Sequence, residues 1–543
     1  MHQLHLADYV VFIIYFIIVA SYGYYIYYKK RAKTADSKDF FLAEGSLTWW
    51  AIGASLIASN ISAEQLIGMS GSGFALGLAI STYEWMAAAT LIIVAVFFIP
   101  VYLKNKIYTM PQFLSVRYND TVSTIMAIFW LLVYILINLT SIIYLGSLAI
   151  TTITGIPFAW CIIGLAVFAT IVTLGGMKVI GYTDVFQVLV LIIGGLVTTY
   201  LALNMVSKHF GYGENILKGF SLLRQKVPSH FHMIFDKSNP YYKDLPGLSV
   251  LIGGMWINNL NYWGCNQYIT QRALGADLKT ARKGILFAGF LKLLIPLIAV
   301  LPGIIMFALY REGVFHTEME GIGGIVKPDH AYPTLLNLLP EGLKGLAFAA
   351  LTAAVVASLA GKANSVSTIF SLDIYKKYMR KDASEKQLVR TGRWAVVLSM
   401  LVACLIVPSM QVLDQAYQFI QEYEGFISPG VLAIFLLGFF WKRTTTAAAL
   451  SAVILTIPLS TVLKFLPVWT NGAFPDYAFL DRMSIVFVIL VFLMIVITLR
   501  DPKSRNKPAL IEVDTRQFKC SPGFIVGSVI IVGILAALYT IFW

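Results

Sequence analysis

Apolar blocks of about 20 residues recur along the whole chain, and short polar stretches separate them. Each block is long enough to cross a membrane, because a bilayer-spanning helix needs roughly 17–25 apolar residues. Hydrophobic residues make up 58% of the 543 residues and charged residues only 13%, against roughly 45–50% and about 25% in soluble proteins. A soluble fold could not bury that much apolar surface, whereas a bilayer accommodates it. The sequence therefore predicts an all-α polytopic membrane protein.

The apolar blocks predict about 14 transmembrane helices in a single domain that covers residues 1–543. The predicted spans are 8–28, 47–73, 76–103, 121–148, 156–175, 181–206, 246–268, 284–310, 342–375, 391–410, 414–440, 445–466, 481–499 and 521–543. The longest connections between them, around 207–245 and 311–341, are too short for a separate folded domain.

Basic residues test this count, because cytoplasmic loops of membrane proteins carry an excess of Lys and Arg. Every second connection is basic, at 29–38, 104–117, 178, 272–283, 376–393, 442–443 and 500–519. An even number of spans with both termini outside satisfies this alternation. The net charge of +13 therefore marks orientation, and we expect no nucleic-acid partner.

Histidine and cysteine offer no catalytic or metal-binding pattern. All seven histidines lie outside the predicted spans, and three of the four cysteines lie inside apolar blocks. No disulfide framework or metal-ligand spacing follows from these positions. We therefore expect neither an enzyme nor a resident metal centre.

The second predicted span contains polar residues that a lipid-facing helix would not carry. Asn60, Glu64 and Gln65 lie near its middle, among many Gly and Ser residues. Packing of small residues between helices would explain the Gly and Ser, but not the adjacent Glu64 and Gln65. Because unpartnered polar groups are costly in hydrocarbon, we predict that this helix is interrupted or faces a polar cavity.

The seventh and eleventh spans show similar irregularities. The segment 253–267 combines paired glycines with several asparagines and two tryptophans, and the eleventh span contains Pro429 and Gly430. Proline removes a helix hydrogen bond and glycine permits a bend. Discontinuous helices at corresponding places in two halves mark the binding site of inverted-repeat transporters. The five-span offset between the second and seventh spans fits that arrangement.

Charged residues inside the predicted spans add candidates for the same site. They are Glu84, Asp184, Lys292, Lys362, Glu422 and Glu424. A structural ion pair or a snorkelling end remains an alternative for Asp184, Glu422 and Glu424. Lys292 is flanked by apolar residues on both sides and needs a carboxylate, carbonyl groups or a polar ligand beside it.

Several strings resemble one family across nearly the whole chain. They are 53–73 (GASLIASNISAEQLIGMSGSG), 83–86 (YEWM), 262–268 (YWGCNQY) with 271–272 (QR), and 421–423 (QEY). These strings resemble the solute:sodium symporters, and in particular their sugar-transporting bacterial members. The resemblance implies the leucine-transporter fold, with broken second and seventh spans around a midplane site. It also implies two inverted five-helix repeats, 47–206 and 246–440, with peripheral helices at 8–28 and 445–543.

The resemblance further implies a solute site and two gates. The residues implied to hold sugar hydroxyls are Gln65, Glu84, Asn259, Lys292 and Gln421. This set offers donors and acceptors in several directions with little net charge, which suits a sugar. Tyr262 resembles an inner gate with Trp263 beside it. Met69, Tyr83 and Tyr417 resemble an outer cover.

By the same resemblance, sodium is the co-transported ion. Its implied ligands are the backbone carbonyls of Ala58, Ile61 and Ala354 and the hydroxyl of Ser358. An unwound helix frees such carbonyls, and a hard cation prefers oxygen ligands. Asp184 resembles the residue through which sodium leaves toward the cytoplasm.

Three positions depart from the family pattern. Ala87 stands where sugar-binding members have serine, and Ala357 stands where a second sodium-site hydroxyl is usual. Lys362 occupies a position that is usually uncharged, one helical turn from Ser358. It could point inward and oppose a nearby cation, or pair with Asp184.

The resemblance implies a sodium-coupled importer of a galactose-like or glucose-like sugar that works by alternating access in the bacterial cytoplasmic membrane. Its expected partners are the sugar, sodium, the lipid bilayer and, in a homodimer, a second copy of the chain. A symporter for an inositol, a sialic acid or an amino acid remains an alternative. A receptor would carry an appended regulatory domain, and a channel would need polar residues along a continuous pore.

Overall fold

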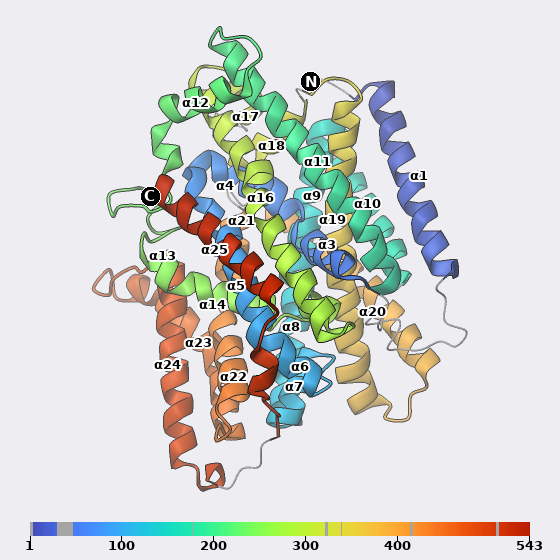
Figure 1. Cartoon of the computed structure of the whole chain (residues 1–543), viewed down its shortest axis with the longest axis vertical. Helices are drawn as coiled ribbons and strands as arrows, with labels where there is room; N and C mark the ends of the chain where they lie inside the picture. The colour runs from blue at the N-terminus through green and yellow to red at the C-terminus, as the bar shows by residue number, and fades with distance from the viewer. Residues whose placement is uncertain are drawn as a thin grey trace.

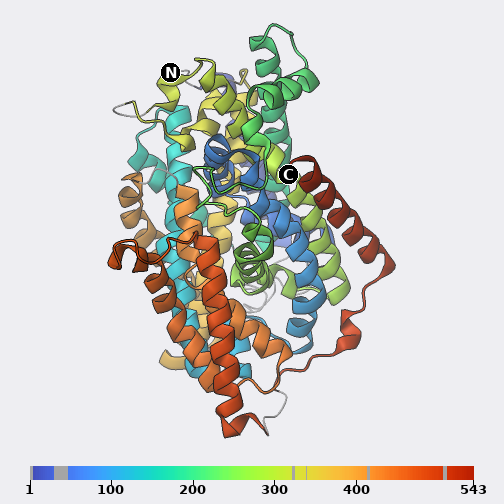
Figure 2. The same cartoon turned by 90° about the vertical axis from the view of Figure 1, so that its left-hand side faces the viewer.

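A computed structural model describes residues 4–29, 47–175, 177–320, 324–337, 339–412, 416–505 and 510–543. The regular secondary structure of this part of the chain is helical, apart from an isolated bridge between Glu320 and Val326. Most helices run roughly along the long axis of the molecule, with the C-terminal helix inclined along one flank (Figures 1 and 2). The all-α prediction is therefore confirmed. The basic residues predicted at 30–38 and at Lys507 lie outside the described residues.

The chain up to residue 231 forms α-helices with short 3₁₀ and π segments (η) between them. They are α1 (Leu6–Lys29), α3 (Trp49–Asn60), η1 (Glu64–Gly68), α4 (Met69–Leu76), η2 (Gly77–Ser81), α5 (Thr82–Ile93), η3 (Val94–Phe98), α6 (Ile99–Lys104), α7 (Met110–Arg117), α8 (Asp120–Leu132), η4 (Val133–Leu139), α9 (Thr140–Thr154), α10 (Phe158–Leu174), α11 (Met177–His209), α12 (Ile216–Lys226) and η5 (Pro228–Phe231).

The remainder of the chain continues in the same way. Its elements are α13 (Ser249–Ile252), α14 (Gly254–Gly264), α15 (Gln267–Leu274), α16 (Leu278–Arg311), α17 (His316–Met319), η6 (Pro328–His330), α18 (Ala331–Asn337), α19 (Leu343–Thr368), η7 (Ile369–Met379), α20 (Glu385–Ile406), η8 (Val407–Val412), α21 (Ala416–Glu424), α22 (Ser428–Phe440), α23 (Thr446–Trp469), α24 (Phe479–Arg500), η9 (Pro502–Ser504), η10 (Thr515–Phe518) and α25 (Pro522–Ile541).

Length and apolar composition identify the membrane-crossing helices. Nine helical segments of the described chain are long and apolar enough to cross a membrane, and the bent pair Tyr417–Glu424 and Ser428–Phe440 would make a tenth. Two further apolar helices, Leu6–Val19 and Phe158–Leu174, are shorter. The protein is thus a multi-pass membrane protein. The count of 14 stays a prediction. A span that is broken into two short helices is not counted when spans are identified by the length of a continuous helix.

The second predicted span is interrupted as the sequence indicates. Helix α3 ends at Asn60, because the backbone of Ile61 is extended (φ −76°, ψ 107°). The wide turn η1 follows, and the Oε1 atom of Gln65 accepts hydrogen bonds from the Ser62 backbone N (3.1 Å) and Oγ (3.0 Å). The side chain of Gln65 therefore accepts the hydrogen bond that the Ser62 backbone N–H cannot make within a helix at the break. Side chains commonly satisfy backbone N–H groups at helix ends in this way.

The seventh and eleventh predicted spans are also interrupted. Helices α14 and α15 are separated at Cys265 and Asn266, where the backbone of Asn266 is extended. Helices α21 and α22 meet at 45°. Pro429 lies in the first turn of α22. Backbone N–H groups in the first turn have no acceptor within the helix, so a proline there removes no helix hydrogen bond. The predicted kink within one helix is thus wrong in detail: the break precedes Pro429, which begins the second helix.

Both ends of the described chain are fixed by hydrogen bonds. The Oδ1 atom of Asp8 accepts from the backbone N atoms of Gly342 and Gly345, both at 2.8 Å, at the start of α19. The N atom of Met233 donates to the carbonyl of Phe542 at 2.7 Å. The N-terminus, α12 and α17 lie at one end of the molecule, and α7 and the end of α24 lie at the other (Figure 1). The basic connections that follow α6 and α24 are therefore remote from the N-terminus.

Candidate functional site

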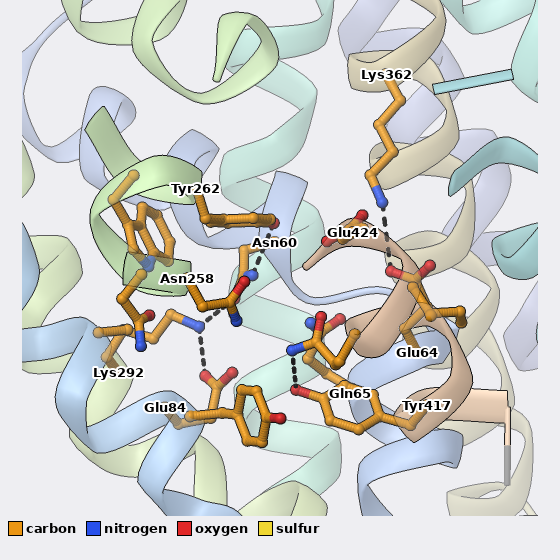
Figure 3. A pocket seen from close by; sticks show the side chains of 16 residues that line it. Asn60, Glu64, Gln65, Glu84, Asn258, Tyr262, Lys292, Lys362, Tyr417 and Glu424 are labelled. Atoms are coloured by element: carbon orange, nitrogen blue, oxygen red, sulfur yellow. Dashed lines mark hydrogen bonds and ion pairs between the residues drawn. The ribbon is translucent and has the colours of Figure 1, made fainter. Parts of the chain in front are cut away.

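One cavity in the described structure gathers most of the predicted solute and gate residues between the broken helices (Figure 3). The predicted residues that line it are Gln65, Tyr83, Glu84, Asn259, Tyr262, Trp263, Lys292, Tyr417 and Gln421. The lining residues to which no solute or gate role is assigned from the sequence are Asn60, Glu64, Ala87, Asn258, Lys362, Ile420 and Glu424. Met69 is fully buried and does not line the cavity, so only this one predicted gate residue is set back from it.

A buried ion pair forms one end of the cavity. The Nζ atom of Lys292, on α16, donates to Glu84 Oε2 on α5 and to Asn60 Oδ1 at the end of α3. Both charged side chains are almost completely buried, with exposed fractions of 1% and 3%. The ammonium also lies 5.1 Å from the centre of the Trp263 ring. The partner that Lys292 requires in an apolar helix is therefore Glu84, supported by an amide that the sequence-based site omitted.

The three amide side chains of the predicted site present different atoms to the cavity. Gln65 uses Oε1 at the break of the helix, which leaves its NH₂ group as a donor. Asn259 donates its NH₂ group to the carbonyl of Met255 at 3.2 Å, which leaves Oδ1 as an acceptor. Gln421 donates to the hydroxyl of Tyr417 at 3.2 Å and keeps its oxygen. The set therefore offers both donors and acceptors, as a polyhydroxylated solute requires.

Aromatic side chains lie on two sides of the cavity. Tyr83 and Tyr417 meet edge to face with ring centres 5.5 Å apart. Tyr262 lies on the opposite side in Figure 3, where its hydroxyl accepts from Asn60 Nδ2 at 2.9 Å. A Cβ atom on Gly68 would lie 3.0 Å from the Cβ of Tyr417, so the glycine lets the tyrosine pack closely against η1. Aromatic groups thus cover the cavity from both directions.

A second buried ion pair lies at the other end of the cavity. The Nζ atom of Lys362, on α19, is 3.3 Å from Glu64 Oε2 on η1. Glu64 also accepts from the hydroxyl of Ser141, and the single hydrogen of the Ser62 hydroxyl is shared between Gln65 at 3.0 Å and Glu64 at 3.3 Å. Of the two alternatives left open for Lys362, the structure shows the inward one: its ammonium pairs with Glu64 and not with Asp184. Lys362 lies one helical turn from Ser358, and Glu64 supplies its carboxylate.

The predicted sodium ligands lie where α19 packs against the broken helix. Ser358 donates from Oγ to the carbonyl of Ser59 at 3.1 Å. Ala58, Ile61 and Ala354 are all buried, with exposed fractions of 2% or less. The carbonyl of Ile61 stands at the extended break, where no regular helix continues. Oxygen atoms of both helices are therefore near one another, as a site for a hard cation requires.

Asp184 is enclosed by an arginine that has no role in the sequence-based site. Arg272, on α15, is fully buried, and its Nη2 atom lies 3.7 Å from Asp184 Oδ2. Ser55 Oγ donates to the same carboxylate at 2.6 Å and accepts from Arg272 Nε at 2.8 Å. A Cβ atom on Gly361 would lie 2.6 Å from Arg272 Nη2, so the glycine leaves room for the guanidinium. In this conformation α3, α11 and α15 are therefore held together at Asp184.

Several residues that the sequence-based site omitted carried a visible signal. Asn60 and Glu64 are polar residues of the interrupted helix, and Lys362 and Glu424 are charges inside predicted spans. Asn258 directly precedes a predicted solute residue, but in a helix adjacent residues need not face the same way. Only the three-dimensional arrangement shows that all of them line one cavity.

A bundle of membrane-spanning helices whose interrupted members surround a buried polar cavity is the architecture of a secondary transporter. The chain belongs to the sodium:solute symporter family, whose family model matches residues 40–456. It is therefore a membrane transporter and not an enzyme, and sodium is the ion that its family co-transports.

The chain is similar to several characterised proteins over most of its length. It is 45% identical to the sodium/glucose cotransporter of Vibrio parahaemolyticus, over all of this chain and 99% of that protein. It is 33% identical to human sodium/myo-inositol cotransporter 2, over 91% of this chain and 75% of that one. The solved structure of a Na⁺-coupled sialic acid symporter matches with a TM-score of 0.77 at 21% identity, over 91% of this chain and 98% of that one. This last similarity shows the fold alone.

Proposed function

We propose that this protein imports a galactose-like or glucose-like sugar together with sodium across the bacterial cytoplasmic membrane. The observation that carries the proposal is the cavity itself, which brings five predicted sugar-binding side chains from α5, α14, α16, α21 and η1 to one place. The sodium/glucose cotransporter that is 45% identical along the whole chain supports the same assignment.

The polar groups of the cavity suit a neutral, polyhydroxylated ring. Lys292 donates, Glu84 accepts, and the amides of Gln65, Asn259 and Gln421 supply the remaining directions. Since Glu84 and Lys292 neutralise each other, they can contact hydroxyl groups without requiring a charged solute. The flat face of Tyr262 is suited to stack on the apolar face of a sugar ring.

Sodium is proposed to bind between Ser358 and the carbonyls of Ala58, Ile61 and Ala354. An ion there would hold α19 against the broken helix and so stabilise the conformation that accepts sugar from outside. Closure of the aromatic cover and release of the Asp184–Arg272 contact would then open the cavity inward. Entry of one positive charge at 100 mV supplies about 2.3 kcal/mol, and the sodium gradient adds to it.

The finer architecture is part of the same proposal. We propose 14 spans with both termini outside, inverted repeats at 47–206 and 246–440, and peripheral helices at 8–28 and 445–543. The basic connections and the five-span offset between the broken helices support this topology. The exposed apolar side chains of α1 and α25 suit lipid contact, and a homodimer stays a prediction that the mass of the detergent-solubilised protein would test.

The test is uptake of labelled sugar by proteoliposomes. Uptake of galactose or glucose should require an inward sodium gradient and should be lost in Gln65→Ala. Equal uptake when potassium replaces sodium would contradict sodium coupling. Competition by unlabelled glucose, galactose, myo-inositol and a sialic acid would identify the solute, and stronger competition by myo-inositol than by either hexose would replace the sugar assignment.

A further inference from the structure

The charges that line the cavity do not cancel. The charged lining residues are Glu64, Glu84, Glu424, Lys292 and Lys362. Each ammonium is already paired with one carboxylate, Lys292 with Glu84 and Lys362 with Glu64. The third carboxylate, Glu424, forms no ion pair with a basic side chain among the described residues. The cavity therefore carries one uncompensated negative charge when all five groups are ionised.

Glu424 is placed to present this charge to the solute. It lies at the end of α21, where the chain bends into α22. The side-chain amide of Asn138 donates to its Oε1 atom, and no other hydrogen bond to its carboxylate occurs in the described chain. A carboxylate can accept about four hydrogen bonds, so most of its capacity remains unused. Figure 3 shows Glu424 beside Glu64 and Lys362, at the end of the cavity remote from Glu84 and Lys292.

Two carboxylates line this end of the cavity. Glu64 and Glu424 contribute carboxylates, and the hydroxyl of Ser141 and the amide of Asn138 contact them directly. The ammonium of Lys362 neutralises one of the two carboxylates wherever it is placed, so sharing it between them would not remove the remaining charge. A monovalent cationic group beside Glu424 would balance the cavity, whereas a second anion would meet repulsion.

We propose that the Glu424 end of the cavity is a subsite for a monovalent cationic group and that it rejects acidic sugars. The group is supplied either by an amino substituent on the sugar or by a second sodium ion. This inference rests on the proposed sugar transport, because it assigns a further part of the same cavity. An amino group would form a charge-assisted hydrogen bond to Glu424, which is stronger than a bond between neutral groups.

The test compares Glu424→Gln with a matched substitution on the same helix. Glu422→Gln removes a carboxylate two residues away, where Glu422 pairs with Arg482 and with Lys464 at 3.0 Å outside this cavity. Glu424→Asp keeps the charge and serves as the conservative variant. Binding of glucose, glucosamine and glucuronate to the purified full-length protein is measured by calorimetry, at a pH where the amino sugar is charged. Sodium titrations of glucose binding form the second arm.

If the cation is an amino group, glucosamine should bind at least about tenfold more tightly than glucose. This ratio should fall to about one in Glu424→Gln and persist in Glu422→Gln and Glu424→Asp. If the cation is sodium, glucosamine should have no advantage, and the Hill coefficient for sodium should fall from about two to about one in Glu424→Gln alone. Glucuronate should bind more weakly than glucose in both cases.

The outcomes separate this inference from the function on which it rests. Glucose binding with an unchanged glucosamine ratio and an unchanged sodium Hill coefficient in Glu424→Gln would overturn the inference alone. Tight binding of glucuronate by the unaltered protein would also overturn it. If the folded, unaltered protein bound none of the three sugars at any sodium concentration, both the sugar assignment and the inference would fall.

Discussion

The two ends of the cavity each contain a buried lysine–glutamate pair, but the two pairs are built differently. At one end Lys292 donates to both Glu84 and Asn60. At the other end Lys362 donates only to Glu64 among the described residues, and the ring of Tyr268 lies 5.4 Å from its ammonium. In the first pair it is therefore the lysine that has an additional hydrogen-bond partner, Asn60.

In the second pair it is the carboxylate that has additional hydrogen-bond partners. Glu64 accepts hydrogen bonds from Ser62 and Ser141 as well as from Lys362. Removing one partner of a buried pair costs stability mainly because the other is left uncompensated. The loss should therefore be largest where the remaining group has fewest other partners. Lys292→Met, Glu64→Gln and Lys362→Met test this rule in order of expected effect, and Ala357→Ser probes the ion site without changing a charge.

Lys292→Met should have the largest effect. It leaves Glu84 buried without a cation and removes a donor from the proposed sugar site. Breaking such a pair costs about 3–5 kcal/mol of folding stability. Losing a hydrogen bond from a charged donor also costs about 1.5–3 kcal/mol of binding, so we expect sugar affinity to fall by about 10- to 150-fold. The measurement is equilibrium binding of labelled sugar to purified protein. Lys464→Met is the control, because Lys464 pairs with Glu422 outside the cavity, and it should leave sugar affinity nearly unchanged.

A second variant separates binding from folding in this test. Glu84→Gln combined with Lys292→Met removes both charges, so no buried ion stays uncompensated. The double variant should recover thermal stability relative to Lys292→Met and still fail to bind sugar. Sugar affinity within about threefold of the unaltered protein in either variant would exclude this pair from the solute site.

The first pair was within reach of sequence reasoning, and the second was not. Lys292 stands in an apolar helix and demands a partner, and the family strings point to Glu84. The breaks at Ile61 and near Cys265 follow from clusters of polar residues that lipid would not tolerate. A charge in an apolar helix and a cluster of polar residues are local features, and the family strings are shared with relatives. Both can be identified from the sequence alone.

Glu64 and Glu424 required the fold, because a charge inside a span does not reveal which carboxylate it meets. Lys362 could have paired with Asp184, and the sequence contains no information on the angular positions of α19, η1 and α11 about the cavity. Arg272 belongs to one of the family strings, yet its contact with Asp184 depends on the space that Gly361 leaves. Side-chain pairing across helices distant in sequence is thus what sequence reasoning could not supply.

Glu64→Gln should have the next largest effect, and on sodium. It removes the carboxylate that pairs with Lys362, which makes the local charge more positive one helical turn from Ser358 and so repels the ion. We expect the sodium concentration for half-maximal sugar binding to rise about tenfold. Glu422→Gln, which also removes a lysine's partner but lies outside the cavity, should not shift it. An unchanged sodium midpoint in Glu64→Gln would place the sodium site away from Lys362.

Lys362→Met should act in the opposite direction and less strongly. Glu64 keeps the hydroxyl groups of Ser62 and Ser141, so losing the lysine leaves it partly satisfied. Removal of the positive charge should lower the sodium midpoint by about three- to fivefold. Sodium titrations of sugar binding measure this shift, with Lys464→Met as the control. A rise of the midpoint instead would mean that Lys362 holds α19 against η1 more than it repels sodium.

Ala357→Ser should have the smallest effect and isolates the ion site from the charged pairs. It adds a hydroxyl beside Ser358 without changing any charge, and one added hydrogen bond contributes about 0.5–1.5 kcal/mol. The sodium midpoint should fall by about threefold, and sugar affinity at saturating sodium should stay the same. Ala353→Ser is the matched control, because Ala353 packs with Tyr15 and Val19 in a separate apolar cluster. Equal shifts in the two variants would show a general effect on α19, whereas a shift in Ala357→Ser alone would place the ion beside Ser358.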